Sequence, residues 1–249
     1  MGQGMSEVAS GLYVTSALVA RQGKVLDEFG ITHVISIQKN PISPFEHRQY
    51  LLIPAKDHIS QDLLQYTAQC NDFIHNARLN QGKVLIHCVE GKSRSPSIAC
   101  IYLMTITGVS WSDVINSLRG VRTLVDPNFA FQRQLKHFYD QLMIQERERL
   151  ITKFGPLHMI DDDKSFVLKN LALYNEDQER RLTGNVVEIK HVPLPTKPSA
   201  IIVSSSSFSD DNEDQSNETN SNSDQFFHNT DLAPMTPESQ SLLDDMFSS

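Results

Sequence analysis

The chain has 249 residues, a formal net charge of −8 and three cysteines. No 18-residue apolar run is present, so no membrane-spanning helix is expected, and no secretory signal is expected before the domain. An odd number of cysteines without a CxxC pair argues against a disulfide framework or a thiolate zinc site and suits a reducing compartment, which predicts a cytoplasmic protein.

The negative charge belongs to one end of the chain. Residues 198–249 carry ten Asp or Glu and no Lys or Arg and are rich in Ser and Asn. Such a segment cannot bury enough apolar surface to offset its ordering entropy, so 197–249 is predicted to be a disordered acidic tail. The remaining residues are close to neutral, so the overall acidity does not argue against an anionic substrate. The sequence contains no stripe of basic and aromatic residues, so a nucleic-acid partner is not predicted.

The first residues, MGQGMS, match the pattern for N-myristoylation, with Gly2 as the acceptor and Ser6 in the required place. One acyl chain gives marginal, reversible membrane binding. The motif therefore predicts a cytoplasmic protein that associates reversibly with the inner face of the plasma membrane.

Short strands alternate with helices along the next part of the chain. Residues rich in β-branched and aromatic types predict strands at 11–16, 32–37, 50–55 and 83–88. Apolar residues at helical spacing predict helices at 62–82, 95–108, 110–122 and 128–150, the second opened by Ser95 as N-cap and Pro96 as the first helical residue.

This alternation predicts an α/β domain over residues 5–150, with a central, mostly parallel sheet flanked by helices. Residues 151–196 are interpreted as an extension or linker, in which KSFVLKNLALYN could form one further helix.

The stretch VLIHCVEGKSRS, residues 84–95, carries the chemistry. A predicted strand ends at Cys88, and a short loop leads to the next helix. A thiol close to a helix N-terminus is more readily ionised, and backbone N–H groups in such a loop form an anion-binding nest. Gly91 permits the tight turn, and Arg94 offers a planar guanidinium that can hold two oxygens at once. The pattern predicts phosphoryl transfer to sulfur.

With these residues, HCVEGKSRS resembles the signature of the cysteine-dependent dual-specificity protein phosphatases, and the chain is most similar to their small, atypical, N-myristoylated members. The resemblance covers about residues 1–155, including LRGVR and DPNFAFQRQL. It implies a protein tyrosine phosphatase-like fold, phosphoprotein substrates such as kinase-signalling components, and no metal or cofactor. It also assigns roles to residues of this loop.

The resemblance implies Cys88 as the nucleophile, Arg94 as the phosphate binder and Ser95 as the group that assists departure of the thiolate. His87 would orient the loop and tune the thiol. The phosphate-binding loop would comprise Val89, Glu90, Gly91, Lys92, Ser93 and Arg94.

A general acid must protonate the leaving oxygen. Asp57 follows the third predicted strand, where α/β active sites form, and it occupies the position of the family's general acid. Asp62, at a predicted helix start, and His58 are the alternatives.

Asn128 and Arg122 also match family positions, and Asn128 would brace the phosphate loop. Two residues depart from the family's usual Asn and Gly: Asp126 and Ala130.

Three functions stay open from the sequence. The main hypothesis is a phosphatase that hydrolyses phosphotyrosine and also phosphoserine and phosphothreonine through a phosphocysteine intermediate. A phosphoinositide phosphatase is the second, favoured by Lys92 and opposed by Glu90. A non-catalytic phospho-binding module is the third, opposed by the presence of both the cysteine and a general acid.

Overall fold

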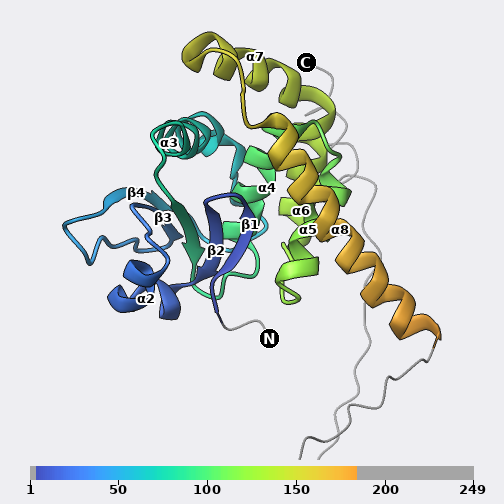
Figure 1. Ribbon diagram of the computed structural model, residues 1–249, viewed down its shortest axis with the longest axis horizontal. Coiled ribbons are helices and arrows are strands. Elements are labelled where there is room, and N and C mark those ends of the chain that lie inside the picture. The colour runs from blue at the N-terminus through green and yellow to red at the C-terminus, as the bar shows by residue number, and fades with distance from the viewer. Residues whose placement is uncertain (1–3, 184–249) are drawn as a thin grey trace, which may run out of the picture. The chain divides into compact units, whose positions relative to one another are not determined.

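The computed structural model describes residues 4–183, which form a five-stranded sheet packed between helices (Figure 1). In spatial order the strands run β1-β2-β5-β3-β4. Their bounds are β1 (Ser6–Ala9), β2 (Leu12–Ser16), β3 (His33–Gln38), β4 (Gln49–Pro54) and β5 (Val84–Cys88). Only β1 pairs antiparallel with its neighbour, and the other pairings are parallel. The predicted α/β fold with a mostly parallel sheet is confirmed. Strand β1 is the one strand that the sequence did not predict.

Helices connect the strands and follow the sheet. Their bounds are α1 (Ala17–Ala20), α2 (Gly23–Glu28), a 3₁₀ turn (Leu64–Tyr66), α3 (Thr67–Leu79), α4 (Arg94–Thr107), α5 (Trp111–Val121), α6 (Phe129–His137), a π-helical segment (Phe138–Leu142), α7 (Met143–Phe154) and α8 (Ile160–Thr183). The predicted helix over 128–150 is therefore α6 and most of α7, joined by the π-helical segment. None of these helices combines the length and apolar composition needed to cross a bilayer.

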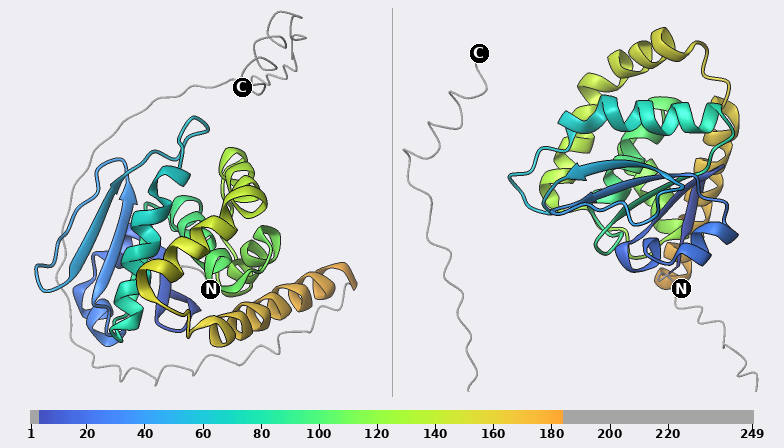
Figure 2. Two further views of the ribbon diagram at one scale, coloured as in Figure 1. Left: turned by 90° about the horizontal axis from the view of Figure 1, so that it is seen from above. Right: turned by 90° about the vertical axis from the view of Figure 1, so that its left-hand side faces the viewer.

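Both faces of the sheet are covered by helices. Because successive side chains of a strand point to opposite faces, neighbouring residues of one strand belong to different cores. Leu85 of β5 packs with Tyr13 and Val34 in a small cluster that includes residues of α1 and α2. Ile86, the next residue, belongs to the large core beneath α3 to α8. Figure 2 shows the short helices on one side of the sheet and the longer helices on the other.

Helix α4 begins two residues earlier than the sequence predicted. The amide of Ser97 donates to the carbonyl of Ser93, which makes Ser93 the N-cap and Arg94 the first helical residue, in place of Ser95 and Pro96. Proline is tolerated at this third helical position because the first turn's N–H groups have no partner within the helix. The shift brings the guanidinium of Arg94 onto the first turn, at the end of the helix that faces Cys88.

Residues 151–196 were interpreted as an extension or linker in which 164–175 could form one further helix, and helix α8 spans that stretch. Helix α8 buries Asp163, Val167 and Asn170 against the fold. The carboxylate of Asp163 forms a bidentate ion pair with Arg78 of α3, at 2.7 Å for both bonds. The folded unit therefore includes α8. The predicted acidic tail, 197–249, and Gly2 lie outside the described residues.

Candidate active site

The loop between β5 and α4 surrounds the sulfur of Cys88. Cys88 is the last residue of β5 and is 1% exposed. The backbone N–H of Gly91 and the hydroxyl of Ser95 both donate to its Sγ, each at 3.2 Å. Two hydrogen-bond donors therefore converge on the sulfur beside the N-terminus of α4.

Gly91 is required in this loop for two separate reasons. Its φ is +70°, in the left-handed region that side chains rarely adopt. A Cβ at this position would also lie 2.5 Å from the carbonyl oxygen of Thr15 and 2.5 Å from Nη2 of Arg122. The loop therefore takes its path only with glycine at this position.

Arg94 and Asp57 face each other across the pocket. Nη1 of Arg94 donates to the carbonyl of Ala55 at 3.1 Å, which fixes the side chain. Its Nε lies 3.4 Å from Oδ2 of Asp57, and this contact lacks hydrogen-bond geometry. Nε is therefore a buried donor without a hydrogen-bond partner within residues 4–183. A tetrahedral anion above Cys88 could accept that hydrogen bond.

Asp57 is held by two further side chains. The hydroxyl of Ser93 donates to its Oδ1 at 2.8 Å, and Nδ2 of Asn128 donates to the same oxygen at 2.9 Å. Asn128 is also the N-cap of α6, since its side chain accepts from the amide of Phe131. One network thus joins the loop after β4, the loop between β5 and α4, and the start of α6.

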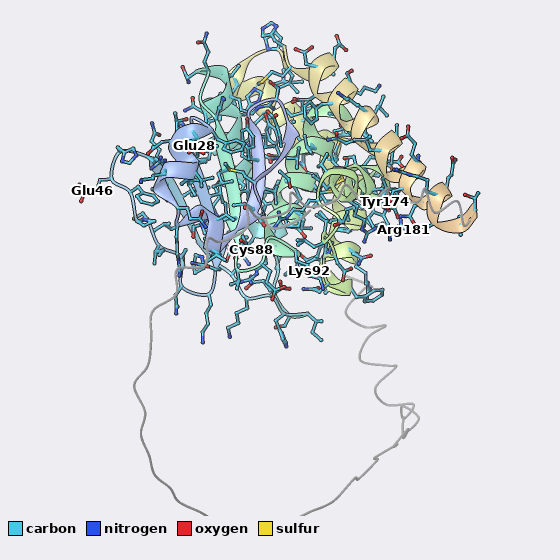
Figure 3. The ribbon with its side chains drawn as sticks, turned by 60° about the horizontal axis from the view of Figure 1, so that its bottom comes forward. Glu28, Glu46, Cys88, Lys92, Tyr174 and Arg181 are labelled. Carbon is cyan, nitrogen blue, oxygen red and sulfur yellow. The ribbon has the colours of Figure 1, made fainter. Side chains whose placement is uncertain are left out.

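A cavity of about 410 Å³ opens above Cys88 at the carboxyl edge of the parallel strands. Its lining comprises Asp57, Cys88, Val89, Glu90, Lys92, Ser93, Arg94, Asp126 and Asn128. Figure 3 shows Cys88 and Lys92 on this face, away from Glu46 and from Arg181 near the end of α8. Gly91 and Ser95 contact the sulfur and are not among the residues that line the cavity.

His87 precedes Cys88 in β5, and its side chain contacts the backbone of Cys88. It is 4% exposed, and its Nδ1 is 3.4 Å from the carbonyl oxygen of Cys88. Burial lowers the pKa of His87 to about 4, against a smaller opposing effect of that carbonyl. The imidazole is therefore neutral at pH 7, so it influences Cys88 through backbone orientation and carries no charge there.

The alternatives to Asp57 lie outside the cavity lining. Oδ1 of Asp62 accepts the amide of Leu64 at 2.8 Å, which is the capping role that the sequence allowed for it. The ring of His58 contacts the hydroxyl of Ser60 at 2.8 Å on an exposed loop.

Two residues of this region were not among the predicted site residues. Asp126 lines the cavity, and its carboxylate lies 3.4 Å from Nζ of Lys92. Arg122 lies beneath the loop, 1% exposed, and donates to the carbonyls of Gly91 and Glu90 at 2.7 and 3.0 Å. The sequence showed that Arg122 matches a family position and that Asp126 departs from one. No local pattern in the sequence indicated the contacts that these two residues make.

Comparisons with known proteins give the family of this site. Residues 12–141 match the model of the dual specificity phosphatase catalytic domain. The chain belongs to the dual specificity phosphatase family. Together with the relatives below, this match makes it a dual-specificity protein phosphatase that acts on phosphoproteins.

Relatives of this phosphatase extend over most of the chain. It is 39% identical to dual specificity protein phosphatase 22 of Xenopus laevis over 185 residues, which are 74% of this chain and 87% of that protein. It is 35% identical to dual specificity protein phosphatase 22 of Mus musculus over 169 residues, 67% of this chain and 92% of that protein. The crystal structure of DUSP15 is 36% identical, with a TM-score of 0.60, and the match covers 62% of this chain and 99% of that one.

Proposed function

We propose that the phosphatase hydrolyses phosphotyrosine, phosphoserine and phosphothreonine through a phosphocysteine on Cys88. The observation that carries this proposal is the convergence of the Gly91 amide and the Ser95 hydroxyl on Sγ, each at 3.2 Å. A sulfur stabilised as an anion at the base of a cavity is placed to attack a phosphorus atom held above it.

The reaction takes place in two steps. The Cys88 thiolate attacks phosphorus, an S–P bond forms and the P–O ester bond breaks. Asp57 transfers a proton to the departing oxygen. Water then attacks phosphorus and gives a proton to Asp57, the S–P bond breaks, and inorganic phosphate leaves. The hydroxyl of Ser95 stabilises the thiolate as it departs in this second step.

Arg94 connects phosphate binding to the proton transfer. Its guanidinium contacts Asp57 at 3.4 Å, and its Nε has no hydrogen-bond partner there. A phosphate dianion that binds this fork replaces the carboxylate as its partner. The carboxyl group of Asp57 is then free to serve the leaving oxygen, while Ser93 and Asn128 keep it in place.

The rest of the loop binds the equatorial oxygens of the phosphate. Val89, Glu90, Gly91, Lys92 and Ser93 supply backbone N–H groups in a nest at the N-terminus of α4. His87 supports the first of these residues through the carbonyl of Cys88, and Asn128 supports the loop through Asp57.

Charges at the rim of the cavity favour a phosphoprotein over a phosphoinositide. Lys92 is the loop residue that would attract a second phosphate, and the carboxylate of Asp126 lies 3.4 Å from its ammonium group. Glu90 adds another negative charge to the cavity lining. Components of kinase signalling are the proposed substrates, by analogy with the family.

We also propose that Gly2 is N-myristoylated and that the protein associates reversibly with the inner face of the plasma membrane from the cytoplasm. The support is the motif MGQGMS alone. Incorporation of a labelled myristate in cells should occur in the wild-type chain and be absent from Gly2→Ala. Equal labelling of both chains would contradict the proposal.

The experiment for the active site is phosphate release from phosphotyrosyl and phosphothreonyl peptides and from soluble phosphoinositides, without added metal. Cys88→Ser should lower turnover of the peptides by at least about 1,000-fold, because serine is a much poorer nucleophile. Retention of appreciable turnover by Cys88→Ser would contradict the mechanism. Lipid turnover that exceeds peptide turnover would favour a phosphoinositide phosphatase.

Asp57→Asn tests the general acid, with Asp62→Asn as the matched control. Loss of the acid should lower kcat on phosphothreonyl peptides by about 100-fold or more. The loss should be much smaller on an aryl ester whose leaving group departs without a proton. Asp62→Asn should keep kcat near the wild-type value. An equal loss on both types of ester would assign Asp57 a role other than proton transfer.

A further inference from the structure

The guanidinium of Arg122 makes its hydrogen bonds with backbone carbonyls from two separate parts of the chain. Nε and Nη2 donate to the carbonyls of Gly91 and Glu90, in the phosphate-binding loop. Nη1 donates to the carbonyl of Gly4 at 3.0 Å, 118 positions away in the sequence. One fully buried side chain therefore holds the catalytic loop and the N-terminal segment together.

This buried charge has no carboxylate partner within residues 4–183, where no acidic oxygen lies within 4.0 Å of it. Burial lowers the pKa of Arg122, and the negative charge of Cys88 acts in the opposite direction. A buried cation without an acidic partner is costly and depends on every hydrogen bond that it makes. Loss of any one of the three carbonyls would leave a donor of Arg122 unpaired in the interior.

Further hydrogen bonds hold the N-terminal segment, residues 4–6, in place. The hydroxyl of Thr15 donates to the same carbonyl of Gly4 at 3.0 Å. The hydroxyl of Ser6 donates to the carbonyl of Val121, the residue before Arg122, at 3.3 Å. Strand β1, which begins at Ser6, also contacts helix α5 (Figure 1). None of Gly4, Ser6 and Thr15 is among the residues that line the cavity.

The phosphate-binding loop is tightly packed against Arg122 and Thr15. Gly91 lies so close to Arg122 and Thr15 that a Cβ there would be 2.5 Å from atoms of both residues. A change in the position of the guanidinium is therefore transmitted to Gly91, whose N–H contacts the nucleophilic sulfur.

We propose that Arg122 is a positioning residue that couples the position of the N-terminal segment, residues 4–6, to the geometry of the phosphate-binding loop. The coupling acts through the hydrogen bond between Arg122 and the carbonyl of Gly4. The proposal rests on the proposed function of that loop. This coupling makes the catalytic rate depend on the hydrogen bonds of Gly4 with Arg122 and Thr15. A force on the N-terminus, when the protein attaches to a surface, is one way to break these bonds.

Two truncations of the full-length protein test this coupling directly. One chain begins at Gly4 and keeps its carbonyl, and the other begins at Met5 and lacks it. We expect kcat for an aryl phosphate to stay within about twofold of wild type in the first chain and to fall by about tenfold in the second, with a smaller change in KM. The alkylation of Cys88 by iodoacetate should slow in parallel. Equal kcat for the two truncations would overturn the proposal.

Substitutions provide a second test in case the shorter chain is unstable. Thr15→Val keeps the shape of the side chain and removes the hydroxyl that holds Gly4, so kcat should fall by about threefold at a temperature well below unfolding. Arg122→Lys should retain more of the kcat than Arg122→Met, because an ammonium group keeps the charge and one donor. No loss in Thr15→Val, or equal kcat in the two Arg122 variants, would contradict the coupling. An inactive wild-type chain would instead refute the proposed function.

Discussion

Two buried arginines hold two regions of this phosphatase, and they are compensated in opposite ways. At the seat of helix α8, Arg78 is neutralised by a bidentate pair with Asp163 and also donates to Tyr102 and Ser10. Burial acts to lower the pKa of Arg78, but these bonds outweigh it and raise it. Beneath the catalytic loop, Arg122 donates to three backbone carbonyls and has no acidic partner within residues 4–183.

The difference teaches how one residue type serves two purposes. A neutralised pair fixes a helix, and its two charges act in opposite directions on the pKa values of its neighbours His75 and Tyr102. An arginine without an acid partner keeps its charge available to the sulfur of Cys88, and the structure bears the cost of its burial. We therefore expect changes at the α8 seat to affect mainly stability and changes at the loop to affect mainly activity.

Asp163→Ala should give the largest effect on stability. It leaves the buried guanidinium of Arg78 without its partner, which should lower the free energy of unfolding by about 3–5 kcal/mol. Urea unfolding measures this loss. The exposed neighbour Asp162→Ala is the control and should change little. In the folded fraction of Asp163→Ala, kcat/KM should match wild type, and a large fall there would break the comparison.

Among the changes that test this comparison, Gly91→Ala should give the largest effect on activity. The added methyl group meets the carbonyl of Thr15 and the guanidinium of Arg122 at 2.5 Å, so the loop must shift. A displacement of this kind should lower kcat/KM by about 100-fold or more. Steady-state kinetics measures it, with near-ultraviolet circular dichroism to show that the variant is folded. Wild-type kinetics in a folded variant would contradict the predicted shift of the loop.

His87→Asn tests how the histidine next to Cys88 makes the free energy of unfolding depend on pH. The pKa of His87 is about 4 in the fold against an ordinary value of 6.5, because of burial. Between these values the unfolded chain binds a proton that the folded chain does not. Stability is therefore fully present above pH 6.5 and is lost as the pH falls towards 4, by at most about 3 kcal/mol. Urea unfolding at several pH values should show a shallower acid loss in the variant, and an unchanged slope would refute this assignment.

Gly120→Ala is the counterpart of Gly91→Ala at the α8 seat. A Cβ at Gly120 would lie 2.1 Å from the carbonyl oxygen of Asn170, so α8 must move away from α5. Overpacking of this kind should lower the free energy of unfolding by about 1–3 kcal/mol, with kcat/KM within about threefold of wild type. Thermal unfolding and kinetics on the same sample measure the two quantities. Lost activity at full stability would reverse the comparison.

The sequence predicted the parts of the site that are close together in the chain. Cys88, Gly91 and Arg94 follow one strand directly, so their chemistry could be inferred from a single stretch. Asp57 could be inferred because the carboxyl ends of parallel strands meet at one edge of a sheet.

Long-range contacts were not predictable in this way. The bonds of Arg122 span 31 residues to Gly91 and 118 to Gly4, and the pair of Arg78 and Asp163 spans 85. Arginine on a helix is ordinarily a solvated surface residue, and nothing in its neighbours marks the burial of these two. The same reason explains why the residues of α8 were interpreted as an extension or linker.

The burial of the other two cysteines determines how the enzyme can recover from oxidation. Cys70 and Cys100 are fully buried, and burial strongly raises the pKa of both thiols. They therefore remain protonated and do not act as resolving nucleophiles. A sulfenic acid formed on Cys88 by a peroxide has no ionised cysteine of its own chain with which to form a disulfide, so its reduction depends on a thiol supplied from outside.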